Sequence, residues 1–239
     1  MVLKLKQSLP RGVLFDLGNT LLFEEYYRPV DGGAALLEMI PHSPEITPER
    51  LQKEARKLVI DLAPRRKESL IEISWATFHR LLLGLFNLEL PSNIPDAEIA
   101  YWNAASKMSP AQGVETMLDR LCGMGIRCGV VSNSIFSSNA LSWILQQHHL
   151  HHYFEFVISS ADIGIRKPHP LIFALAATRL DMSYEEIWYI GDRILLDVWG
   201  SSSAGMTGVW YNPRRTITDE MQPEIELVSW TELCDLLKK

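Results

Sequence analysis

Short apolar runs alternate with helix-like segments along this sequence, and three of the runs lead directly into a polar residue. The runs are 12–15, 128–131 and 187–191, and the polar residues that follow them are Asp16, Ser132 and Asp192. Runs of this length are typical of strands buried in a parallel sheet. Because crossover helices place the carboxyl ends of such strands at one edge, where ligands bind, we expect the three polar side chains to meet there.

The same alternation continues through the second half of the chain. We expect strands over 127–132, 154–159, 187–191 and 208–211, and helices over about 110–125, 133–149, 170–180, 193–207 and 230–237. This order predicts an α/β fold with a doubly wound parallel sheet.

Residues 22–107 follow a different pattern, in which apolar residues recur at helical spacing. Thr47 followed by Pro48 predicts a helix start, and Ser69 with Glu72 predicts a capping box. We therefore predict an inserted all-helical domain over 22–107 and a core domain formed by 1–21 and 108–239. Trp75, Phe78 and Trp102 are interpreted as the apolar core of the insertion.

Composition limits the classes of partner. The formal net charge of −6 argues against nonspecific attraction to nucleic acid or to an anionic membrane. No segment has the apolar length of a membrane span, and the N-terminus lacks a signal-peptide pattern. We expect a cytoplasmic protein, a monomer or a homodimer, with a small-molecule partner. Cys122, Cys128 and Cys234 are odd in number and lack CxxC spacing, so we expect free thiols.

Two polar clusters are interpreted as structural. His148, His149, His151 and His152 fall where a helix is expected to end, where polar and cationic side chains suit the helix dipole. The run Arg65-Arg66-Lys67 is interpreted as a solvated face.

Four short motifs occur in a fixed order along the predicted core. They are Phe15-Asp-Leu-Gly-Asn-Thr20, Val130-Val-Ser-Asn133, Arg166-Lys-Pro168 and Ile190-Gly-Asp-Arg-Ile-Leu-Leu-Asp197. Together they resemble the motifs of the haloacid dehalogenase-like (HAD) superfamily, over about 12–22 and 108–211. The resemblance implies a HAD-like Rossmannoid core, and it implies that the helical insertion is a C1-type cap.

The resemblance also implies an activity: Mg²⁺-dependent hydrolysis of a small phosphorylated metabolite through an aspartyl-phosphate intermediate. Asp16 would be the nucleophile, and Lys167 would neutralise the phosphate and the Asp16 carboxylate. The implied Mg²⁺ ligands are Asp16, the Gly18 carbonyl, Asp192 and Asp197, and the implied phosphate contacts are Asn19, Thr20, Ser132, Asn133 and Lys167. Phosphoryl transfer needs this combination of a nucleophile, a divalent cation and fixed donors.

One position departs from the family pattern. Gly18 stands where the family's phosphatases usually carry a second aspartate, the general acid/base. Loss of such a group costs ~10²–10⁴ in rate. The protein would then be slow, would act on leaving groups that need little protonation, such as acyl phosphates and anomeric sugar phosphates, or would recruit a carboxylate such as Glu24 or Glu25.

Two alternative functions also fit the sequence. A 2-haloacid dehalogenase-like hydrolase fits the Ser132-Asn133 motif, but the family's dehalogenases work without Mg²⁺ and lack the acidic pair that Asp192 and Asp197 form here. A catalytically silent phosphate-ligand binding or regulatory protein fits the glycine at position 18.

Overall fold

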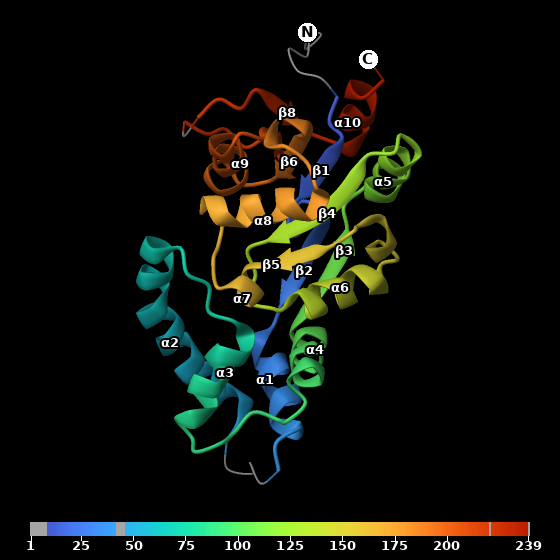
Figure 1. The fold of residues 1–239 in the computed structure, drawn as a ribbon. Coiled ribbons are helices and arrows are strands. Elements are labelled where there is room, and N and C mark those ends of the chain that lie inside the picture. The colour runs from blue at the N-terminus through green and yellow to red at the C-terminus, as the bar shows by residue number, and fades with distance from the viewer. Residues whose placement is uncertain (1–8, 42–45, 220, 239) are drawn as a thin grey trace.

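The computed structural model describes residues 9–41, 46–219 and 221–238 of the chain. Figure 1 shows a sheet covered by helices at one end of the molecule and the helices α1 to α4 at the other. None of the helices in the described ranges combines the length and the apolar character that crossing a membrane requires.

A parallel sheet forms the larger part. Its strands, in spatial order, are β5 (Val157–Ser159), β4 (Arg127–Ser132), β1 (Gly12–Phe15), β6 (Ile187–Gly191), β7 (Thr207–Tyr211) and β8 (Ile225–Leu227). The predicted α/β class with a parallel sheet is confirmed. Strand β8 was not predicted, because it is only three residues long and its apolar side chains are interrupted by Glu226.

Helices cover both faces of the sheet. They are α5 (Val114–Gly123), α6 (Ser138–Gln147), α7 (Ser160–Ile163), α8 (Pro170–Leu180), α9 (Trp199–Ala204) and α10 (Trp230–Leu236). Val13 and Phe15 belong to one buried apolar cluster and Leu14 belongs to another. Successive strand side chains point to opposite faces, so β1 is packed on both sides, as its apolar sequence predicts.

The insertion begins and ends with strands. Strand β2 (Leu22–Tyr27) pairs antiparallel with β3 (Ser106–Pro110), and the helices α1 (Pro29–Glu38), α2 (Pro48–Ser69), α3 (Trp75–Gly84) and α4 (Ile94–Ala105) lie between them. The expectation of helix from residue 22, and of a helix starting near 110, was therefore wrong at these positions. Aromatic residues favour the strand in β2, and its partner lies more than seventy residues away, beyond the reach of a local pattern.

Helix starts in the insertion agree with the sequence in one case and differ in another. Thr47 caps α2, since its hydroxyl accepts a hydrogen bond from the Arg50 N–H (3.2 Å), as predicted. The predicted capping box of Ser69 and Glu72 is wrong, because Ser69 is the last residue of α2 and its hydroxyl donates to the Arg65 carbonyl (2.6 Å). Ser74 caps α3 instead.

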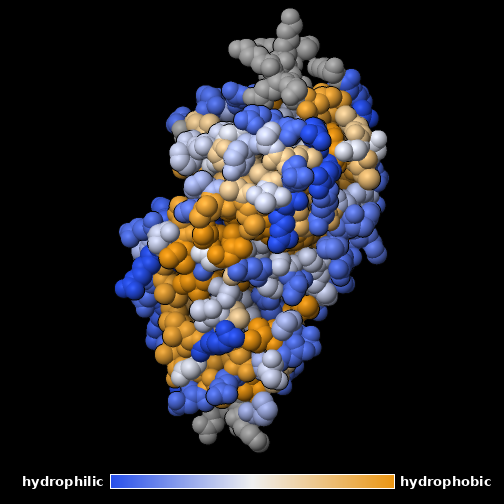
Figure 2. All heavy atoms as spheres, in the orientation of Figure 1, coloured by the Kyte–Doolittle hydropathy of each residue, from blue (hydrophilic) through white to orange (hydrophobic). Residues whose placement is uncertain are grey.

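Apolar side chains gather on the face of the molecule that Figure 2 shows. The exposed large apolar side chains include Val59 and Ile60 of α2 and Leu171 of α8. Trp75 and Trp102 are buried as predicted, whereas Phe78 is only half-buried and lines a cavity of about 150 Å³ between α2, α3 and α4. Arg66 is also partly withdrawn from solvent, which corrects its interpretation as part of a solvated run.

Candidate active site

The carboxyl edge of the sheet brings the strand-ending residues together. Asp16 follows the central strand β1, and its backbone N–H donates to the Ile190 carbonyl of β6 (2.9 Å). Ser132 ends β4 on one side of β1, and Asp192 follows β6 on the other side. This is the point at which the strand order reverses, where parallel α/β sheets bind their ligands.

The Lys167 side chain lies buried at this edge, between Asp16 and Asp197. Its Nζ donates to Asp16 Oδ1 (2.6 Å), Asp197 Oδ1 (2.7 Å) and the Tyr189 hydroxyl (2.7 Å), and lies 3.1 Å from the Val131 carbonyl. Only 2% of the Lys167 side chain is exposed. Burial lowers the pKa of this lysine, but the charges of Asp16 and Asp197 outweigh burial and hold the pKa well above its ordinary value. The buried ammonium is therefore charged.

Three carboxylates cluster beside this lysine. Asp16, Asp192 and Asp197 each offer an oxygen, and these oxygens lie within 4.8 Å of one another. Burial raises the pKa of Asp192 to about 7, and Asp16 and Asp197 add to the effect. Burial also raises the pKa of Asp16 to about 6, against the charge of Lys167.

The donor set fits a hard divalent cation. Three carboxylates carry more negative charge than the single Lys167 ammonium neutralises, and their mutual repulsion is relieved when a cation binds between them. The Gly18 carbonyl belongs to the loop that follows Asp16, and Gly18 is partly exposed at this edge.

Asp197 is held in place by its own backbone turn. It lies in a π-helical turn (Ile194–Val198) after β6, and its Oδ2 accepts a hydrogen bond from the Arg193 N–H (2.9 Å). A side chain at Gly191 would collide with it, since a Cβ there would lie 2.4 Å from Asp197 Cγ. Single π turns of this kind often occur at functional sites.

The predicted phosphate contacts are placed in different ways. Asn133 lies against Lys167, whose N–H donates to Asn133 Oδ1 (2.7 Å), while Asn133 Nδ2 donates to the Lys167 carbonyl (3.0 Å). Asn19 adopts a left-handed backbone (φ 57°), and its N–H donates to the Leu22 carbonyl (2.7 Å). Thr20 is fully buried, and its hydroxyl has no hydrogen-bond partner among the described residues. The phosphate-binding roles of these residues remain predictions.

Tyr189 is a site residue that sequence reasoning missed. It lies on β6, is fully buried, accepts a hydrogen bond from Lys167 and donates to the Val131 carbonyl (2.7 Å). A tyrosine inside an apolar strand is usually a core residue, but a buried hydroxyl needs a partner. That requirement is the only signal in the sequence that pointed to it.

Glu24 and Glu25 are engaged in the β2–β3 ribbon. Glu24 accepts from the Ser106 hydroxyl (3.1 Å), and Glu25 forms an ion pair with Lys107 (2.7 Å). These contacts give neither glutamate a place next to Asp16. A cavity of about 160 Å³ opens at the candidate site itself and is lined by Asp192, Asn19, Phe23 and Arg214 among others.

The chain belongs to the haloacid dehalogenase-like hydrolases, whose family model matches residues 67–211, more than half of its length. This membership confirms the resemblance that the motifs indicated and the prediction that the protein is a hydrolytic enzyme. Glyceraldehyde 3-phosphate phosphatase of Methanopyrus kandleri is 27% identical over 237 residues, which cover 96% of this chain and 97% of the relative.

Solved structures agree on the fold. A HAD phosphatase from Thermococcus onnurineus has a TM-score of 0.66 and 25% identity, with 95% of this chain and 97% of that chain covered. A 2-haloacid dehalogenase from Pseudomonas syringae pv. Tomato DC3000 has a TM-score of 0.69 and 22% identity, with 97% and 99% covered. The second likeness concerns the fold alone, because both activities are built on the same architecture.

Proposed function

We propose that this protein is a Mg²⁺-dependent phosphohydrolase that transfers the phosphoryl group of a small metabolite to Asp16. The observation that carries the proposal is the position of Asp16: one oxygen lies 2.6 Å from the charged, buried Lys167, and the carboxylate lies within the cluster formed with Asp192 and Asp197. This arrangement combines a nucleophile, a fixed cation and a set of metal ligands.

The reaction has two displacement steps. In the first, an Asp16 oxygen attacks phosphorus while the bond to the leaving-group oxygen breaks, so that the leaving group departs with the bonding electron pair. In the second, water attacks the phosphorus of the aspartyl phosphate, and inorganic phosphate leaves with restoration of the Asp16 carboxylate. Lys167 offsets the negative charge that gathers between Asp16 and the phosphoryl oxygens. A bound Mg²⁺ supplies further positive charge to those oxygens.

Gly18 bears on the choice of substrate. With no aspartate at this position, the leaving-group oxygen takes its proton from solvent. Acyl phosphates and anomeric sugar phosphates have leaving groups that best tolerate departure without a protein acid.

The phosphatase name of the M. kandleri relative supports a small phosphorylated metabolite as substrate, and makes glyceraldehyde 3-phosphate the first compound to test.

The dehalogenase alternative has less support. Its fold is shared, but Asp192 lies with Asp16 and Asp197 in an acidic cluster for which metal-free dehalogenation has no use. The silent-binder alternative rests on Gly18 alone, and it predicts that phosphate is bound or trapped without turnover.

A metabolite panel with and without Mg²⁺ tests the proposal. We expect phosphate release that requires Mg²⁺, and we expect Asp16→Asn to abolish it without lowering the melting temperature of the protein by more than a few degrees. Equal rates for the wild type and Asp16→Asn would contradict the mechanism. Halide release from a 2-haloacid in the absence of Mg²⁺ would favour the dehalogenase instead.

A further inference from the structure

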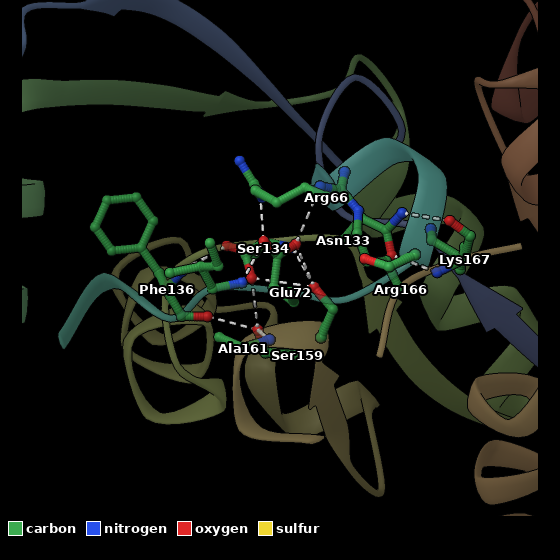
Figure 3. Close-up of polar contacts among 12 residues, drawn as sticks. Arg66, Glu72, Asn133, Ser134, Phe136, Ser159, Ala161, Arg166 and Lys167 are labelled. Atoms are coloured by element: carbon green, nitrogen blue, oxygen red, sulfur yellow. Dashed lines mark hydrogen bonds and ion pairs between the residues drawn. The ribbon is translucent and has the colours of Figure 1, made fainter. Parts of the chain in front are cut away.

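Glu72 is a buried carboxylate in the segment between α2 and α3 of the helical insertion. Only 1% of its side chain is exposed. Its Oε1 accepts a hydrogen bond from Arg66 at the end of α2, and its Oε2 lies 3.6 Å from Arg166 Nη1, a residue of the core (Figure 3). Glu72 therefore links Arg66 of the insertion to Arg166 of the core, the residue that immediately precedes Lys167.

The backbone around Glu72 is paired with the segment that leads to Lys167. The Arg166 N–H donates to the Leu70 carbonyl (3.0 Å), and the Glu72 N–H donates to the Gly164 carbonyl (2.9 Å). Ile71 and Ile165 form the antiparallel bridge between these bonds. The insertion thus holds the Lys167 segment by hydrogen bonds as well as by charge.

A second connection runs from Glu72 to the segment after β4. The Ser160 hydroxyl donates to Glu72 Oε2 (2.9 Å) and accepts a hydrogen bond from the Ser134 N–H (3.0 Å). The neighbour of Ser134, Asn133, holds the backbone of Lys167 through both of its side-chain polar atoms. The segment that contains Lys167 and the segment after β4 flank the proposed phosphate position. Both are therefore linked to the Glu72 carboxylate, the first through Arg166 and the second through Ser160.

Electrostatics make Glu72 difficult to replace. Burial lowers the pKa of Arg166, the charge of Glu72 opposes this, and Arg66 and Arg193 lower the pKa further. Without the carboxylate, Arg66 and Arg166 would face each other as unpaired, half-buried cations. Breaking a buried ion pair from one side is strongly destabilising, so the two arginines would separate and the Lys167 segment would move with Arg166.

We propose that Glu72 is a positioning residue for the phosphate-binding segments of the core. It acts through Arg166 and Ser160. The correct placement of Lys167 therefore depends on the position of the helical insertion against the core. This inference rests on the proposed function, in which Lys167 stabilises the phosphoryl group.

The test compares Glu72→Gln with the wild type at a temperature where both are folded, using p-nitrophenyl phosphate and Mg²⁺. We expect kcat to fall about 10–100-fold, as when a supporting partner of a functional residue is lost, and the inhibition constant of inorganic phosphate to rise. The Mg²⁺ concentration that gives half-maximal activity should stay the same, because no described contact links Glu72 to Asp16, Asp192 or Asp197.

Glu98→Gln is the matched control. Glu98 is also a buried glutamate of the insertion that binds the core, but it accepts its hydrogen bonds from the N–H (2.8 Å) and hydroxyl (2.5 Å) of Ser137, at the start of α6. We expect it to lower stability and leave kcat unchanged. Glu72→Asp serves if Glu72→Gln does not fold, since it keeps the charge and shortens the reach to Ser160 and Arg166.

Amide hydrogen exchange of residues 161–173 separates this inference from the proposed function. In Glu72→Gln the exchange of this segment should accelerate, and in Glu98→Gln it should match the wild type, whether or not the protein hydrolyses phosphate esters. An inactive wild type with accelerated exchange in Glu72→Gln would overturn the proposed function alone. Wild-type exchange and wild-type kcat in a folded Glu72→Gln or Glu72→Asp variant would overturn the positioning role.

Discussion

Lys167 keeps a positive charge at a position where almost none of its side chain reaches solvent. It does so because two carboxylates and two neutral oxygens surround its ammonium group. The cost of burying the three Asp carboxylates is in turn offset by this lysine and, when it is bound, by a divalent cation. The lysine and the acids are therefore stable only as a group, and substitution of one changes the charge state of the others.

Gly191 is required by the position of Asp197. A methyl group at residue 191 would lie 2.4 Å from Asp197 Cγ and 2.5 Å from its Oδ2, so Gly191→Ala should push the carboxylate away from Lys167 and the Arg193 N–H. We expect activity to fall about 10–100-fold and stability to fall by about 1–3 kcal/mol. Gly84→Ala, at the end of α3 where a Cβ meets nothing within 4 Å, is the control; it should leave the kinetics unchanged and should not lower stability, because alanine is favoured over glycine in a helix. Full activity of Gly191→Ala would show that the position of Asp197 is not critical.

Gly18 offers room for the acid that the family usually places there. A Cβ at this position meets no atom within 4 Å, so Gly18→Asp introduces a carboxyl group without a clash. We expect it to accelerate hydrolysis of alkyl phosphates by up to ~10², and acyl phosphates far less, because only the first class needs a proton on its leaving group. Gly18→Asn has the same shape and no proton to give. A slower Gly18→Asp enzyme, or an equal gain in Gly18→Asn, would refute the argument.

At the scale of single residues, the sequence predicted those site residues that strong local signals mark. Asp16, Asp192 and Lys167 could be found because strand ends and short motifs mark them, and the structure brings all three together. Tyr189 and Glu72 could not be found in this way. Tyr189 has the pattern of a core residue, and Glu72 was assigned to a helix cap although its partners Ser160 and Arg166 are distant in the sequence.

At the scale of elements, five of the six strands of the sheet were predictable, whereas β8 and the ends of the insertion were not. Apart from Arg127 and Glu155, the five predicted strands consist mostly of apolar residues, so that burial on both faces can be read from their sequence. The β2–β3 ribbon instead depends on pairing between Leu22–Tyr27 and Ser106–Pro110, two strands that are separated in the sequence by the helices α1 to α4 and that carry exposed charges such as Glu25 and Lys107. Such pairing leaves little trace in either strand alone.

His79 makes the stability of α3 depend on pH. It is 3% exposed, donates from Nδ1 to the Trp75 carbonyl (2.9 Å), and burial lowers its pKa from 6.5 to about 4. The unfolded chain therefore binds a proton first as the pH falls, so the stabilisation is complete above the unfolded pKa and is lost between about 6.5 and 4.

Urea unfolding of the wild type and of His79→Gln tests this dependence. Between about pH 7 and about pH 5 we expect the wild type to lose roughly 2 kcal/mol more unfolding free energy than the variant, which has no group to titrate at this position. Parallel pH profiles of the two proteins would show that His79 does not titrate in this range.

At the scale of the whole molecule, the sheet provides the reacting groups and the helical insertion provides contacts that reach them. Glu72 and Glu98 both extend from the insertion to the core, at Arg166 and at Ser137 (Figure 3 shows the first). Of the boundaries proposed from the sequence, 22–107 for the insertion and 1–21 with 108–239 for the core, the first coincides with the start of β2 and the second divides β3 after its second residue. The ribbon therefore forms the covalent link between the two parts.

The most direct test of this account is detection of the aspartyl phosphate. The protein is mixed with Mg²⁺ and a phosphorylated substrate that it hydrolyses, quenched in acid during turnover, digested, and analysed by mass spectrometry. We predict one phosphoryl group on Asp16 in the wild type and none in Asp16→Asn. Turnover with a phosphoryl group on another residue, or unchanged turnover in Asp16→Asn, would contradict it.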